Sequence, residues 1–157
     1  MLPKTIVVVL LATFSALALQ AEDDACSLLT QARVSEVLGA SVAAGQHMSE
    51  TPTGRRVCTW SQPGENSPMG KRVTVTLFGP AGQLTPADRF INSKKQPNVT
   101  PVAGIGDDAF VRRIGGLATH IYVKKGEAVF QLTVGGFNEN DTPIIEEALA
   151  RDAVSKL

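Results

Sequence analysis

Residues 102–136, VAGIGDDAFVRRIGGLATHIYVKKGEAVFQLTVGG, decide the fold that we expect for this chain. The stretch contains three apolar runs in which apolar and polar residues alternate, which is the pattern of half-buried strands. Gly115 and Gly116 separate the first two runs, and Gly126 and Glu127 separate the last two. Connections this short join antiparallel neighbours, so the stretch predicts three consecutive antiparallel strands.

The segment before this stretch predicts two more strands and a helix. VCTWSQ from Val57 alternates in the same way, and KRVTVTLFG from Lys71 is a clear strand. In LTPADRFINSKKQ, Thr85 is a candidate N-cap and Pro86 occupies the first helical position, so we expect a helix that ends near Lys95.

Two further helices are expected near the ends of the chain. Apolar residues at mixed three and four spacing predict a helix over 27–38, with Gly39 placed to stop it. Asp141 or Thr142 is the candidate N-cap of a C-terminal helix with Pro143 at its start, and its expected apolar side is formed by Ile144, Ile145, Ala148, Leu149 and Val154. Residues 41–56 have no sustained period, which favours a loop or a short irregular strand.

The order helix, two strands, helix, three strands, helix predicts an α+β domain. Hairpin-length connections require antiparallel neighbours, so we expect a five- or six-stranded, mainly antiparallel sheet with helices packed largely on one face.

The first 21 residues have the outline of a signal peptide. Lys4 precedes an apolar run over 6–19, and the small residue Ala21 stands just before acidic residues. The run is shorter than the roughly 20 residues of a spanning helix. We therefore expect a signal peptide over 1–21, a single domain over 22–157, periplasmic or secreted localisation, and no transmembrane segment after cleavage. A retained membrane anchor is the alternative.

The chain has two cysteines, and Cys58 lies two residues before the single tryptophan, Trp60. In an oxidising compartment an even cysteine count favours a disulfide, so we expect Cys26 to pair with Cys58. A thiol nucleophile would need a nearby base, and zinc would need about four ligands at compact spacing. Alternation places Trp60 on the same face as Cys58, which favours a core tryptophan over a ligand-stacking one.

Charge composition excludes one class of partner and suggests a weak candidate site. Fifteen basic and fifteen acidic residues balance, which argues against nucleic-acid binding. Basic doublets recur along the strands, and a row of them could bind an anionic partner through Arg112, Arg113, Lys124 and Lys125. The competing interpretation is that these residues keep strand ends and edges soluble.

Four segments together resemble a known family. CSLLTxAxVxxVLG from Cys26, CTWS from Cys58, GIGDDAF from Gly104 and IYVKKGEAVFQLTV from Ile121 are similar to a family of small exported bacterial proteins of unknown function, many of them actinobacterial lipoproteins. The resemblance covers nearly all of the mature chain. It implies export, an α+β fold and pairing of the two cysteines, but no activity. This chain departs from the lipoprotein members because EDDA before Cys26 does not suit lipid attachment.

The residues indicate no reaction. His47 and His120 lie in no catalytic motif, and GIGDD from Gly104 lacks the lysine and further glycine of a phosphate-binding loop. We expect no cofactor and no metal. The sequence favours a non-catalytic binding or interaction module of the cell envelope, whose partner is an envelope ligand or protein. The alternative is an envelope hydrolase whose site lacks local motifs.

Overall fold

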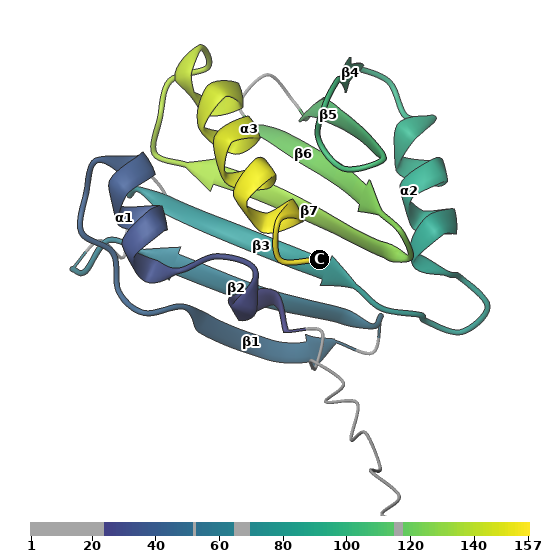
Figure 1. Cartoon of the computed structure of the whole chain (residues 1–157), viewed down its shortest axis with the longest axis horizontal. Helices are drawn as coiled ribbons and strands as arrows, with labels where there is room; N and C mark the ends of the chain where they lie inside the picture. Colours follow the sequence, from purple (N-terminus) through teal and green to yellow (C-terminus); the bar gives the residue numbers. More distant parts are fainter. Residues whose placement is uncertain (1–23, 52, 65–69, 115–117) are drawn as a thin grey trace, which may run out of the picture.

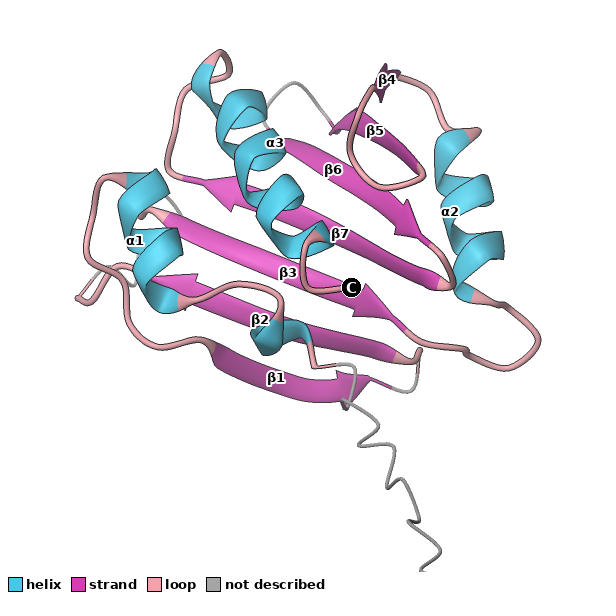
Figure 2. Ribbon diagram, viewed as in Figure 1, coloured by secondary structure: helices cyan, strands magenta, loops and turns pink. Residues whose placement is uncertain are grey.

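Within residues 24–51, 53–64, 70–114 and 118–157, which the computed structural model describes, seven strands form one antiparallel sheet (Figures 1 and 2). The strands are β1 (Gln46–Thr51), β2 (Arg55–Ser61), β3 (Arg72–Phe78), β4 (Val99–Val102), β5 (Asp108–Ile114), β6 (Ala118–Lys125) and β7 (Ala128–Gly135), in the order β1-β2-β3-β7-β6-β5-β4. The helices are η1 (Ala25–Ser27, a short 3-10 helix), α1 (Gln31–Leu38), α2 (Pro86–Lys94) and α3 (Asp141–Val154). The expected signal peptide over 1–21 lies outside the described residues.

The α+β class is confirmed, but the strand count is seven rather than five or six. Strand β1 lies in the segment for which a loop or a short irregular strand was expected, and β4 was not expected; these two strands are the two edges of the sheet. An edge strand has a neighbouring strand on one side only, so its faces are less well covered and its inward positions can be polar. Here β1 reads QHMSET, and β4 contains Pro101, a residue that edge strands tolerate. Neither segment therefore carries the apolar alternation that marks the other five strands.

One face of the sheet carries the main core. Alternate residues of the central strands are fully buried there, including Val73 and Val75 of β3, Ile121 of β6 and Leu132 of β7. Helices η1, α1 and α3 pack on this face, and Figure 1 shows α1 and α3 lying over the sheet. Burial of apolar surface on this face is the main stabilising contribution of the fold.

Helix α2 packs on the second face, at one end of the sheet. Its Phe90 is 2% exposed and lies 5.1 Å, centroid to centroid, from Phe110 of β5, which stacks in turn on Tyr122 of β6 at 4.9 Å. Phe110 and Tyr122 alternate along their strands with residues of the main core, so this aromatic cluster belongs to the opposite face. The helices are thus divided, with α1, α3 and η1 on one face and α2 on the other.

The helix termini explain two differences from the expected boundaries. The helix expected over 27–38 is divided into η1 and α1, because the Thr30 side chain accepts a hydrogen bond from the Arg33 N–H and starts α1 there. Gly39 ends α1 with φ 58°, as expected. Helix α2 begins with a capping box between Thr85 and Asp88, which confirms the expected start.

The buried side of α3 agrees with the expected one in part. Ile144 is 69% exposed, whereas Leu149, Ala150 and Ala153 are fully buried. Glu146 is fully buried with them. Of the expected residues, Leu149 is fully buried and Ile145 and Val154 pack against the main core, whereas Ile144 points away from it. The small residues Ala150 and Ala153 lie on the same buried side, where α3 contacts β6 and β7.

Candidate functional site

The second face of the sheet is covered by α2 at one end only, and the rest of this face carries polar side chains. Among the described helices, only α2 packs on it, through β6 and β7. We call the uncovered part the open face and define it by seven half-buried residues that alternate with core residues along five strands: Thr59, Thr74, Thr76, Arg112, His120, Gln131 and Thr133.

Five of these residues form one continuous row across the sheet. Thr59 pairs with Thr74, and Thr74 pairs with Thr133. The Thr133 hydroxyl lies 2.7 Å from the Nδ1 atom of His120, and His120 pairs with Arg112. Neighbouring strands are about 4.8 Å apart, so the four steps of this row extend over roughly 19 Å. A single register therefore places three hydroxyls, an imidazole and a guanidinium in a line.

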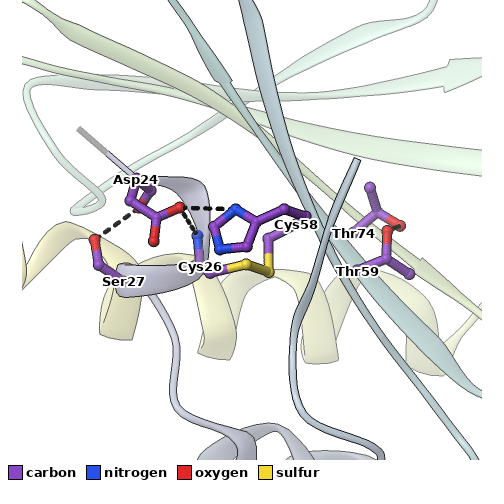
Figure 3. The surroundings of a disulfide bond; sticks show 7 residues. Asp24, Cys26, Ser27, Cys58, Thr59 and Thr74 are labelled. Atoms are coloured by element: carbon purple, nitrogen blue, oxygen red, sulfur yellow. Dashed lines mark hydrogen bonds and ion pairs between the residues drawn. A yellow bond between two sulfur atoms is a disulfide. The ribbon is translucent and has the colours of Figure 1, made fainter. Parts of the chain in front are cut away.

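The threonines of the row are held by one another and by the strands. The hydroxyls of Thr59 and Thr74 are 3.1 Å apart and hydrogen-bonded. Figure 3 shows these two side chains on the side of β2 opposite to Cys58, whose sulfur is directed into the core. Threonine is stiff at its first side-chain torsion, so ordering these hydroxyls on binding costs little.

His120 is the most constrained polar group of the open face. Its Nδ1 atom lies 2.6 Å from Gln131 Nε2 and 2.7 Å from Thr133 Oγ1. Because an amide N–H donates, Nδ1 is the acceptor and the imidazole proton is on Nε2. Burial lowers the pKa of His120, and the positive charge of Arg112 lowers it further. His120 is therefore neutral at neutral pH, with a donor to offer at Nε2.

Arg112 ends the row with a guanidinium that has no acidic partner among the described residues. Its Nε atom is buried without a hydrogen-bond partner. In contrast, Arg33 pairs with Asp152 at 2.6 Å, and Arg113 pairs with Glu139 at 3.8 Å. An unpaired, half-buried guanidinium is an uncompensated charge, and a planar anion is the group that matches its donor geometry.

The four basic residues singled out in the sequence do not form one row. As the pleat requires, the members of each doublet point to opposite faces, with Arg112 and Lys124 on the second face and Arg113 and Lys125 on the first. Lys125 pairs with Asp107 at 3.1 Å. Arg112 and Lys124 stand opposite His120 and Asp108, four residues apart along β5, so they lie at different ends of this face.

The expected disulfide between Cys26 and Cys58 is present and joins η1 to β2 (Figure 3). Trp60, 1% exposed, faces the same core as Cys58, so the core interpretation of Trp60 is confirmed. Nearby, Asp24 Oδ1 lies 3.3 Å from His47 Nδ1 and accepts the Cys26 N–H. Both sulfurs are committed to the bridge, which leaves Cys58 without a thiol chemistry of its own.

Sequence reasoning missed the threonines, Gln131 and Glu146. His120, which lies in no catalytic motif of the sequence, contacts Thr133 across the β6–β7 pair. The sequence shows that Thr59, Thr74 and Thr133 occupy polar positions in strands where apolar and polar residues alternate. Their alignment, however, depends on the order of the strands in the sheet. Thr74 and Thr133 are neighbours only because β3 pairs with β7.

Comparisons of the chain with family models, with curated proteins and with solved structures find no match. Of the helices in the described part of the chain, none is long and apolar enough to cross a membrane.

Proposed function

We propose that this protein is an exported, non-catalytic binding module of the bacterial cell envelope, and that it binds its ligand on the open face. The observation that carries the proposal is the cross-strand row from Thr59 to Arg112, which presents fixed hydroxyls, a neutral imidazole and an unpaired guanidinium in one register. Preorganised polar groups of this kind provide specificity in ligand sites.

The composition of the row indicates a ligand rather than solubility alone. Long charged side chains such as lysine and glutamate are enough to keep a sheet face soluble. The row instead has short threonines at its centre, which permit a ligand to approach the sheet closely. Such groups suit a hydroxylated molecule with a carboxylate or similar anion at the Arg112 end.

Export is supported by two observations. A disulfide persists in oxidising compartments such as the periplasm, and this chain pairs both of its cysteines. The N-terminal sequence has the outline of a signal peptide, and the family that the sequence resembles is exported. A periplasmic or secreted location fits both.

The alternative, an envelope hydrolase, is favoured by one contact only. The Thr133 hydroxyl and His120 Nδ1 are within hydrogen-bond reach, as a nucleophile and its base must be. However, Nδ1 also receives the Gln131 amide at 2.6 Å, and no carboxylate among the described residues is paired with the imidazole. A catalytic base needs that third group to orient it, so we assign His120 to binding.

The proposal is tested by detecting a bound molecule and by measuring how variants of the open face change its retention. Native mass spectrometry of protein isolated from its own envelope should show an adduct that denaturation releases. Thr74→Val and Arg112→Gln should each reduce its retention. Thr100→Val, an exposed threonine of β4, and Arg113→Gln, the neighbour that points to the other face, are the matched controls. Equal retention in Arg112→Gln and Arg113→Gln would contradict the assignment.

A further inference from the structure

A separate pocket of about 290 Å³ lies between α2 and the adjoining ends of β5 and β6. Its apolar floor is formed by Ala87, Phe90 and Ile91, three residues of α2. Phe90 is anchored in the aromatic cluster at 2% exposure, whereas Ile91 is 49% exposed. Small-molecule sites occupy about 300–1,000 Å³, so this pocket has the size of a small ligand rather than of a protein segment.

The rim of the pocket is basic. Lys94, Lys95 and Lys124 line it together with Asp108, so three ammonium groups face one carboxylate. Lys94 Nζ lies 2.5 Å from Asp108 Oδ2 and 5.9 Å from the centre of the Phe90 ring, directly at the floor. Lys95 and Lys124 have no ion-pair partner in the part of the chain that the structure describes. The lining residues of the rim therefore carry two more positive than negative charges, and Asp107 outside the lining interacts electrostatically with Lys124.

We infer that this pocket binds a small amphipathic phosphate monoester, with its alkyl or aryl group against Phe90 and Ile91 and its phosphate between Lys95 and Lys124. A phosphate monoester has a charge of about −1.5 to −2 at neutral pH, which matches the excess of the rim. Lysine binds phosphate as a point charge with three rotatable donors, and needs no planar fork. The floor supplies the apolar contact that free phosphate cannot use.

The dipole of α2 does not help the lysines to hold the anion. Lys94 lies in the last turn of this helix and Lys95 is its C-cap, at the end where the carbonyl ends of the peptide dipoles point outward and repel anions. Binding of phosphate here consequently depends on the ammonium groups, and their neutralisation should abolish most of the affinity. The site is independent of the open face, because none of its residues belongs to the cross-strand row.

The test is titration of the ¹⁵N-labelled protein with n-decyl phosphate below its micelle concentration, followed by two-dimensional NMR. Amide shifts should be confined to α2 and to the strands around Asp108 and Lys124. Replacing both Lys95 and Lys124 by Gln should weaken binding by about tenfold, since each exposed ion pair contributes less than one decade of affinity. Ile91→Ser should weaken it as well. Lys156→Gln and Ile144→Ser, exposed residues outside the pocket, are the matched controls.

The probes separate the parts of the inference. Inorganic phosphate and n-decyl maltoside, which each lack half of the proposed ligand, should bind at least about tenfold more weakly if apolar contact and charge both contribute. Equal affinity for the maltoside or for n-decanoate would overturn the phosphate assignment. Unchanged affinity in the double lysine variant would overturn the site. The protein could instead sediment with phosphatidylglycerol vesicles in a way that depends on Ile91, and show no binding of decyl phosphate. That result would identify a membrane-contact surface and would also overturn the inference.

Discussion

Glu146 is the residue whose removal should change stability most unexpectedly. It lies on the sheet-facing side of α3 with no exposed surface, among the apolar residues of the main core. Its Oε1 accepts the Val134 N–H at 3.3 Å, whereas Oε2 has no hydrogen-bond partner. Burial raises the pKa of Glu146 to about 7. The Thr119 hydroxyl opposes this increase, although Thr119 Oγ1 and Glu146 Oε2 do not meet hydrogen-bond geometry.

The expected size of the effect follows from the two pKa values. The ordinary pKa of this carboxyl is 4.5, and the folded protein raises it to about 7. Between these values the folded state retains a proton that the unfolded state has lost, so the free energy of unfolding falls as pH rises. At about 1.4 kcal/mol per pKa unit, Glu146 makes the protein about 3 kcal/mol less stable above pH 7 than below pH 4.5.

Glu146→Gln keeps the size of the side chain and removes its titration. Urea denaturation at closely spaced pH values should show that the free energy of unfolding falls by about 3 kcal/mol more in the original protein than in Glu146→Gln across this window. Other titrating groups contribute equally to both proteins and cancel. Glu147→Gln, at a half-exposed position paired with Arg151, is the control and should preserve the original pH profile.

The reasoning fails if Glu146→Gln and the original protein lose stability in parallel as pH rises. It also fails if the Glu146 carboxyl carbon, followed by ¹³C NMR in the folded protein, titrates near its ordinary value. The second measurement remains decisive if Glu146→Gln does not fold.

The remaining predictions concern the bridge and the packing around it. Intact mass should show two alkylated cysteines only after reduction, and reduction should cost about 3–4 kcal/mol, because the bridge closes a loop with a sequence separation of 32. Alkylation without reduction would contradict the bridge. Trp60→Ala should cost about 3–5 kcal/mol by chemical denaturation, since the side chain is 1% exposed, and a loss below about 1 kcal/mol would show that it is not a core residue. Gly45→Ala should cost about 1–3 kcal/mol, because the added Cβ would lie 2.7 Å from Cys58 Sγ and 2.8 Å from Trp60 Cε2; unchanged stability would mean that the bridge can shift.

Local signals in the sequence were sufficient for most elements of the fold. Apolar and polar residues alternate in strands β2, β3, β5, β6 and β7, and α2 starts at a Thr-Pro pair. The five strands and this helix were therefore predicted near their observed positions. Strand β4 was missed, and β1 was expected only as a loop or a short irregular strand, because both edge strands bury little and lack apolar alternation. The expected side of α3 included Ile145, Leu149 and Val154, which contact the main core. It omitted Glu146, because hydrophobic periodicity counts a charged residue as solvent-facing.

The candidate site could not be predicted in the same way, because its residues are brought together by pairing between distant strands. Thr59 and Thr74 belong to a hairpin-like pair, and Arg112 and His120 belong to another, so each half of the row is local in sequence. The halves meet only where β7 inserts between β3 and β6. A shift of one residue in the β3–β7 register would turn Thr74 to face Leu132, a core position, and would bury a hydroxyl. The apolar residues of the main core therefore fix the register, and the register in turn aligns the polar row on the opposite face.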